Sequence, residues 1–368
     1  MLEEELIAVL ALQKAKGVGD IIAKKLIAHC GSAQNVFAEK KLLLEKITGV
    51  GSERLKYLSD KKYFKLAEKE LTYIQKNKLT SCYYQNDNYP SRLKQCIDGP
   101  ILLFQDGNIN LDNPRVISIV GTRKMTLYGR DFVNQFIEEL KPYNPIVVSG
   151  FAYGVDITAH KAAVKNKLQT IGVLAHGFEQ IYPKVHKKYV HQVNESGGFY
   201  SEFWHNEDPL QKNFLKRNRI VAGMSEATII IESAERGGSL VTADIANSYS
   251  RDVFAVPGKT TDSLSRGCNN LIKTNRAGIL TSAKDLVEAL NWELKPNQPK
   301  AIQKQLFIDL PKEEQLVYNY LLKCGKKHID SIALDCNIPV YKLATLLFNM
   351  EMKGVIRPLQ GKLFEVIN

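Results

Sequence analysis

Several short motifs that mark common enzyme classes are absent from this sequence. It contains no C-x-x-C, no H-E-x-x-H, no G-x-S-x-G and no G-x-x-x-x-G-K-[ST]. These absences argue against a zinc protease, an α/β-hydrolase and an ATP-driven motor, and the missing G-x-G-x-x-G disfavours an NAD enzyme. The seven histidines show no ligand spacing with Cys or Asp. We therefore expect no metal, no cofactor and no catalytic residue.

Long apolar runs are also missing. No stretch approaches the ~20 apolar residues of a membrane span, and the chain begins with acids where a signal peptide has cations. The six cysteines have no regular spacing, which is typical of reduced thiols. We expect a cytoplasmic protein without a membrane partner. Its 368 residues, 44% hydrophobic and 24% charged, fit an ordinary globular chain of two or three domains.

The charge balance favours a polyanionic partner. Fifty basic residues stand against 39 acidic ones, which gives a net charge of +11. The excess is spread along the chain rather than gathered in one segment. It favours nucleic acid as a partner, although a surplus of Lys is also common on solvated surfaces.

Glycine-rich turns are the most informative feature. They lie at Ser118–Gly129, Val147–His160, Phe214–Gly223 and Glu235–Ala246, each beside a β-branched run. Each is therefore predicted to join a strand and a helix. Free N–H groups and the positive end of the dipole make a helix start suitable for phosphate. With Arg and Lys beside several such turns, we expect a phosphate-binding surface.

Residues 114–290 alternate between apolar strands and helices, which predicts a parallel sheet covered on both faces. Ligands of such sheets bind beyond the carboxyl ends of the strands, where the glycine turns fall. The predicted strands are Val116–Val120, Ile146–Ser149, Thr170–Leu174, Gly198–Glu202, Thr228–Glu232, Asp252–Val256 and Gly278–Leu280. The predicted fold class is α/β, with a Rossmann-like parallel sheet core, an N-terminal helical domain and a C-terminal winged-helix domain.

The domain boundaries follow from changes in pattern. Residues 1–80 are predicted to be helical, with two helix-hairpin-helix-like turns that either contact phosphate or only pack against protein. Residues 81–291 form the extended Rossmann-like domain, including an added edge element, and 292–310 form a polar linker. Residues 311–368 are predicted to be three helices and a hairpin, a winged helix whose core includes Leu343, Leu347 and Met350.

The turns carry polar and cationic side chains of defined chemistry. The guanidinium of Arg123 can donate two parallel hydrogen bonds to a phosphate. The basic cluster around Asn218, which comprises Lys216, Arg217 and Arg219, is predicted at the start of an apolar helix. Asp156 and His160 are either an acid–base pair or, as we favour, a helix cap and a packing residue. The candidate nucleic-acid-binding residues are Gly121, Thr122, Arg123, Ser149, Gly150, Gly154, Lys216, Arg217, Asn218, Arg219, Gly238, Ser239, Thr242 and Lys259.

The ordered motifs G-T-R, S-G-x-A-x-G-V-D-x-x-A-H, F-x-x-R-N-R-I-V-A-G and G-S-L-x-T-A resemble those of the DNA-processing protein A family (DprA, also called Smf). The resemblance extends from about Tyr83 to Leu290. It implies a homodimer that binds single-stranded DNA through Arg123, the basic cluster and the Gly238 turn. It further implies protection of incoming DNA and loading of the recombinase RecA during natural transformation and recombination.

Two other functions remain open at this stage. One is a nucleoside-monophosphate hydrolase of the related lysine-decarboxylase-like group, although GGSLVTAD lacks that group's G-T pair and its Glu and keeps only Asp244. The other is a protein adaptor with incidental basic residues. We favour the non-enzymatic DNA binder, and expect alanine at Arg123 or at Lys216 to weaken oligonucleotide binding several-fold.

Overall fold

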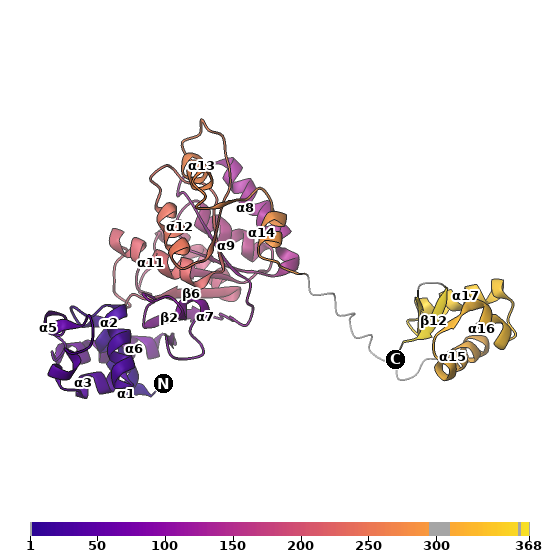
Figure 1. The fold of residues 1–368 in the computed structure, drawn as a ribbon, viewed down its shortest axis with the longest axis horizontal. Coiled ribbons are helices and arrows are strands. Elements are labelled where there is room, and N and C mark those ends of the chain that lie inside the picture. Colours follow the sequence, from indigo (N-terminus) through magenta and orange to yellow (C-terminus); the bar gives the residue numbers. More distant parts are fainter. Residues whose placement is uncertain (1, 294–309, 360–361, 368) are drawn as a thin grey trace. The chain divides into compact units, whose positions relative to one another are not determined.

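The computed structural model describes residues 2–293, 310–359 and 362–367. The chain divides into two compact units, residues 1–293 and 294–368 (Figure 1). Most of the predicted linker lies outside the described residues, as do Gln360 and Gly361 in the segment predicted to form the C-terminal hairpin.

The first unit opens with a cluster of helices. In α6, Tyr63, Ala67, Leu71 and Ile74 are buried at spacings of four, four and three, which is one face of a helix. That face packs with buried side chains of α1 in a common core. The helices of this cluster are α1 (Glu3–Lys14), α2 (Asp20–Cys30), α3 (Ala33–Ala38), α4 (Lys41–Leu44), α5 (Gly51–Arg54) and α6 (Lys62–Lys76).

The two glycine hairpins of this cluster contact each other. A Cβ on Gly17 would lie 2.7 Å from the carbonyl oxygen of Arg54, so the first turn packs directly against the second. Lys25 donates a hydrogen bond to Thr48 O at 2.9 Å, and Lys24 donates one to Cys96 O at 2.9 Å. These contacts support the packing role, and a contact of the hairpins with DNA stays a prediction.

Within residues 2–293, nine strands form one sheet in the order β1-β2-β6-β5-β4-β3-β7-β8-β9. The antiparallel strands β1 (Thr80–Tyr83) and β2 (Leu102–Gly107) extend it beyond β6, and all other neighbours are parallel. The parallel strands are β3 (Val116–Val120), β4 (Ile146–Ser149), β5 (Thr170–Val173), β6 (Gly197–Ser201), β7 (Ala227–Ile230), β8 (Asp252–Ala255) and β9 (Gly278–Ile279). The predicted α/β class with a mostly parallel sheet is confirmed.

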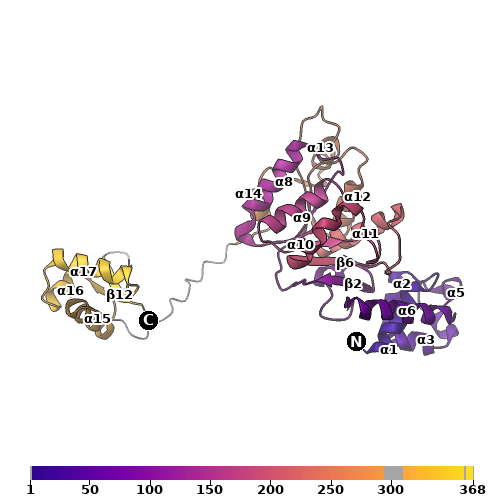
Figure 2. The ribbon, with the colours of Figure 1, turned by 180° about the vertical axis from the view of Figure 1, so that it is seen from behind.

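Helices cover both faces of this sheet (Figures 1 and 2). Because side chains alternate along a strand, Ile117 and Ile119 of β3 join one core and Val116 and Val120 join the other. The first core includes α8 (Leu127–Glu139), α9 (Val155–Lys165) and α14 (Ala283–Ala289). The second includes α11 (Gln211–Met224), α12 (Gly238–Ser248) and α13 (Arg266–Lys273). Shorter elements are α7 (Ser91–Lys94), η1 (Lys141–Tyr143), η2 (Lys184–Tyr189) and α10 (Val190–Glu195).

One helix differs from its predicted position. Helix α11 begins at Gln211, so the basic cluster around Asn218 lies in the middle of the helix and not at its start. The preceding polar residues are compatible with a helix, and Asn213 bonds back to Asp208 O at 2.9 Å. The predicted strands of the sheet agree with the observed ones to within one or two residues at each end.

The second unit contains α15 (Lys312–Cys324), α16 (Ile329–Asp335) and α17 (Val340–Met352). Strands β10 (Lys327–His328), β11 (Ile356–Leu359) and β12 (Leu363–Val366) form an antiparallel sheet in the order β10-β12-β11. Leu343, Leu347 and Met350 are buried in its core, as predicted.

Cations near the exposed face of α17 are paired with acids of the same unit. Lys342 lies 2.5 Å from Glu313, and Lys353 lies 2.6 Å from Glu314. In the described parts of the chain, no individual helix has the length and apolarity of a membrane span. Taken together, the bent pair α16 and α17 reaches that length and composition.

Candidate functional site

A cavity of about 560 Å³ lies at the carboxyl ends of β3, β4 and β7. Its wall is formed by the turns that follow these strands, the first turn of α12 and one face of α11. Parallel strands bring their carboxyl ends to one edge, so turns that are distant in the sequence meet there. The cavity is lined by nine of the fourteen candidates, all of them described residues: Gly121, Thr122, Arg123, Gly150, Arg217, Asn218, Gly238, Ser239 and Thr242.

Gly150 leaves the space that two charged groups occupy. A Cβ at this position would lie 2.3 Å from Nη1 of Arg217 and 2.5 Å from Oδ2 of Asp156. Arg217 donates through Nη1 to the carbonyl oxygen of Gly150 at 2.6 Å and also to that of Val173. The glycine after β4 therefore allows a guanidinium and a carboxylate to reach the floor of the cavity.

Burial controls the ionisation of this pair. It raises the pKa of the Asp156 carboxyl, while the charge of Arg217 and the N–H of Ala152 oppose the shift. It lowers the pKa of Arg217 to about 10, against the opposing effect of Asp156. Arg217 therefore stays cationic at neutral pH. Its Nε is buried without a hydrogen-bond partner among the described residues, so one donor remains unused.

Two aromatic side chains of the cavity were missed by the sequence analysis. The guanidinium carbon of Arg123 lies 4.9 Å from the ring centroid of Phe214, and that ring meets Tyr182 edge-on with centroids 5.6 Å apart. All three residues line the cavity. A cation beside aromatic rings suits a nucleobase, which stacks on π-faces and guanidinium planes. The signal for Phe214 was its position two residues before Lys216, the first residue of the basic cluster.

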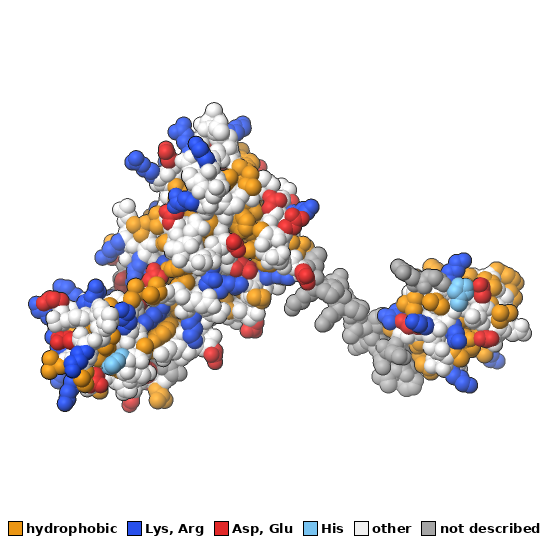
Figure 3. Space-filling view, in the orientation of Figure 1, with side chains coloured by type: hydrophobic (Ala, Val, Ile, Leu, Met, Phe, Trp, Pro, Cys, Tyr) orange, Lys and Arg blue, Asp and Glu red, His pale blue; other side chains and the backbone are white. Residues whose placement is uncertain are grey.

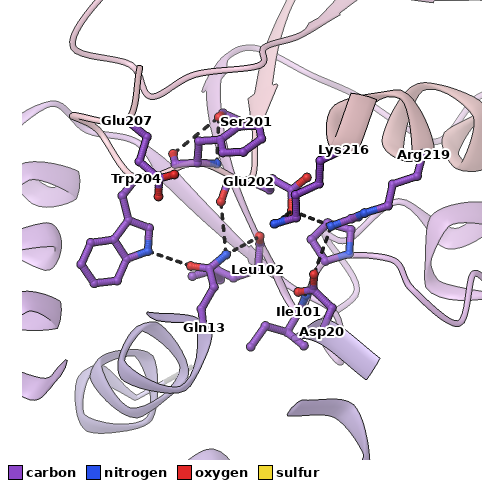
Figure 4. A network of polar contacts seen from close by, with 12 residues as sticks. Gln13, Asp20, Ile101, Leu102, Ser201, Glu202, Trp204, Glu207, Lys216 and Arg219 are labelled. Atoms are coloured by element: carbon purple, nitrogen blue, oxygen red, sulfur yellow. Dashed lines mark hydrogen bonds and ion pairs between the residues drawn. The ribbon is translucent and has the colours of Figure 1, made fainter. Parts of the chain in front are cut away.

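Lys216 and Arg219 do not line the cavity. Both point toward Glu202, a carboxylate that is almost fully buried (Figure 4). Lys216 lies 2.8 Å from Glu202, and Arg219 contacts Glu202 at 2.5 Å and Asp20 at 3.0 Å. The helical repeat explains this division, since residues i and i+3 share one face while Arg217 projects from another.

The other three candidates also lie outside the cavity lining. Ser149 is buried and donates to the carbonyl oxygen of Ile119 at 2.6 Å, which ties β4 to β3. Gly154 has a φ of +74°, and a Cβ there would lie 2.2 Å from Thr122 O, so it allows the turns after β3 and β4 to touch. Lys259 is exposed in the loop after β8.

The geometry disfavours the alternative of an acid–base pair and corrects the prediction that Asp156 is the helix cap. Helix α9 begins at Val155 with Gly154 at its N-cap, so Asp156 lies inside the first turn and is not the cap. Its carboxylate accepts from Ala152 N at 3.2 Å, while Nδ1 of His160 contacts Thr170 Oγ1 at 2.7 Å. Burial lowers the pKa of His160 to about 3. His160 is therefore a neutral packing residue at physiological pH.

Asp244, the one carboxylate that supported the alternative hydrolase function, lies outside the cavity. Its side chain is exposed and pairs with Arg276. Among the described residues, no three His, Cys, Asp or Glu side chains form a group that could hold a metal ion. On the face seen in the space-filling view, basic side chains are interspersed with acidic ones over the first unit (Figure 3).

Comparison with known proteins points to one family. Residues 80–291, more than half of the chain, match the model of the family described as DNA recombination-mediator protein A. The DNA processing protein DprA of Streptococcus pneumoniae is 34% identical over 249 residues, which cover 68% of this chain and 87% of that protein. Its X-ray structure superposes with a TM-score of 0.66 at 32% identity, covering 79% of this chain and 99% of that one.

A second solved structure is that of DNA processing protein A from Helicobacter pylori, a protein described as having a unique single-stranded DNA binding mode. It matches with a TM-score of 0.53 at 27% identity and covers 58% of this chain and 97% of that one. The segment matched by the family model contains the whole parallel sheet and the cavity at its carboxyl edge. The chain thus belongs to the DNA recombination-mediator protein A family.

Proposed function

We propose that this chain binds single-stranded DNA in the cavity at the carboxyl edge of its sheet. The observation that carries the proposal is the contact between Arg123 and Phe214 at 4.9 Å, with both residues lining the cavity. A base stacks on an aromatic face without regard to sequence, and an unpaired strand exposes its bases for this purpose. The single-stranded DNA binding mode described for the Helicobacter pylori protein supports the same partner.

The glycine turns supply the complementary contacts to phosphate. Helix α12 begins at Gly238, and the first N–H groups of a helix have no partner within it. Thr242 is buried in the cavity wall one turn further along the same helix. Arg217 adds a buried cation whose Nε has no partner among the described residues. We assign base stacking to Phe214 and Arg123, and phosphate contact to the start of α12 and to Arg217.

Two of the sequence candidates take a different role in this proposal. Arg219 is 7% exposed and forms ion pairs with Asp20 and Glu202, so we assign it to structural support of α11. Lys216 is half exposed but neutralises Glu202. We place neither in direct contact with the strand.

Titration with labelled oligonucleotides tests the proposal. A twenty-nucleotide oligothymidylate and a duplex of equal length are compared by fluorescence anisotropy over a salt series. We expect tighter binding of the single strand, with an affinity that falls as salt rises because phosphate contacts release counterions. Preference for the duplex, or no binding of either, would contradict the proposal.

The family relationship motivates three further proposals. We propose that the chain forms a homodimer, that it protects incoming DNA in natural transformation, and that it loads RecA onto the bound strand. Multi-angle light scattering tests the dimer, and survival of the bound strand under nuclease tests protection. RecA loading predicts a shorter lag before RecA hydrolyses ATP on a strand already covered by a single-strand-binding protein.

For the second unit, we propose the winged-helix class. Three helices followed by the antiparallel strands β11 and β12 support it. Of its cations, Lys342, Lys353 and Arg357 each pair with a glutamate, which disfavours the use of these three side chains in reading DNA. The isolated unit is expected to leave the anisotropy of a labelled duplex unchanged at micromolar concentration.

A further inference from the structure

A second hollow, of about 540 Å³, lies beside the cavity and shares Arg123 with it. It is bordered by α8, α9, η2 and the turns that follow β3 and β4. The turn after β3, which carries Arg123, therefore borders both hollows. None of the candidate residues predicted from the sequence, apart from Arg123 and Gly154, contributes to it.

The second hollow is much more basic than the cavity. Among the described residues, five cations and no carboxylate line it, whereas the cavity has two cations, Arg123 and Arg217, and the acid Asp156. None of the five forms an ion pair with another described residue. The five cations are Arg123, Lys124, Arg130, Lys161 and Lys188. Uncompensated like charges around one concave surface attract a polyanion.

Aromatic rings lie among these cations. The ammonium groups of Lys161 and Lys188 lie 5.5 and 5.2 Å from the ring centroid of Tyr189. Tyr153, which is 43% exposed, borders the same hollow and packs edge-on against the ring of His186 at 5.1 Å. A basic groove with exposed aromatic side chains is the arrangement that tracks the backbone of an unpaired strand while its bases stack.

We infer that the second hollow is a further subsite for the phosphodiester backbone of single-stranded DNA, which a strand enters from the cavity past Arg123. The inference rests on the proposed function. In this arrangement the cavity holds a base and its phosphate. The second hollow neutralises the phosphates that follow along the strand. Long strands then occupy both sites, and very short ones occupy the cavity alone.

The test compares two variants with the same net charge. In the first, Lys161→Gln is combined with Lys188→Gln, which removes two cations of the second hollow. In the matched control, Lys165→Gln is combined with Lys187→Gln, which removes exposed lysines of α9 and η2 that do not line it. All four side chains are exposed, so both proteins are expected to fold, as circular dichroism can verify.

Affinity for four- and twenty-nucleotide oligothymidylates is then measured across a salt series. Each neutralised phosphate contributes about 0.7 to the slope of log K against log salt, so the first variant should lose about 1.4 in slope. At 0.1 M salt this corresponds to about 25-fold weaker binding of the long strand, with short-strand affinity unchanged. The control should bind both oligonucleotides as the wild type does.

The outcomes separate the two proposals. If the wild type binds the long strand and the first variant keeps its affinity and slope, the subsite is refuted while the cavity stands. Equal losses in the control would likewise refute it, because the effect would then reflect net charge alone. A wild type that binds neither oligonucleotide would overturn the proposed function, and the subsite with it.

Discussion

The guanidinium of Arg123 and the ring of Phe214 form a cation–π contact, with 4.9 Å between the guanidinium carbon and the ring centroid. One residue lies in the turn after β3 and the other in the first half of α11. The contact orients the exposed Arg123 over the cavity. A base or phosphate that binds there therefore contacts a guanidinium in a fixed orientation rather than a freely rotating side chain.

Arg123→Ala should weaken binding of a twenty-nucleotide strand about tenfold, since it removes a phosphate or stacking contact worth about 1–3 kcal/mol. Lys216→Ala should change it less than twofold because its ammonium is already paired with Glu202 at 2.8 Å. This revises the equal effects expected from the sequence alone. Fluorescence anisotropy measures both variants, and similar losses in the two would place Lys216 on the strand.

Phe214→Ala should weaken single-strand binding about 5- to 100-fold, because stacking on one aromatic ring contributes about 1–3 kcal/mol. The salt slope should stay the same, since no charge is removed. Phe214→Tyr keeps the ring and serves as the matched control with near-normal affinity. A changed slope, or a tyrosine variant as weak as the alanine one, would argue against stacking.

Gly150→Ala should destabilise the protein by about 1–3 kcal/mol, because its Cβ would collide with Arg217 and Asp156. Gly238→Ala is the control, since a Cβ there meets no atom of the described residues within 4 Å. Urea unfolding of the two variants provides the measurement. Equal stability of both would mean that the guanidinium and carboxylate can move aside without cost.

Acidification should destabilise the fold partly through His160. Its pKa is about 3 in the folded protein and about 6.5 when unfolded, so between these values only the unfolded chain takes the proton. The stability associated with neutral His160 is complete above pH 6.5 and falls by about 1.4 kcal/mol per pH unit below it.

The variant His160→Gln should therefore have a shallower dependence of unfolding free energy on pH between 6.5 and 5 than the wild type. His29→Gln, which replaces a histidine at an exposed position, is the control variant. Urea unfolding at several pH values in this interval measures the slopes. Parallel curves for wild type and His160→Gln would indicate that His160 titrates normally.

The sheet and its turns could be predicted from the sequence because their signals are local. A β-branched run followed by glycine identifies the end of a strand, and parallel topology then brings Gly121, Gly150 and Gly238 to one cavity. No information about distant contacts was needed for this step.

The division of the basic cluster could not be predicted. Its outcome depends on where α11 begins and on two distant acids, Asp20 and Glu202, which draw Lys216 and Arg219 to the opposite side from Arg217. The second hollow was missed for a related reason. Its lysines Lys161 and Lys188 belong to no motif in the sequence, and only the packing of α9 against η2 brings both to the ring of Tyr189.

The polar contacts drawn in Figure 4 limit how the N-terminal helical cluster can move. Gln13 donates to the carbonyl oxygen of Glu202 and accepts from the indole of Trp204, while Asp20 bonds both Arg219 and the backbone of Ile101. The helical cluster is thereby fastened to α11, the helix that carries Phe214. The cluster cannot move away from the sheet unless the buried guanidinium of Arg219 loses its contact with Asp20, so it holds the helix that carries Phe214 in place.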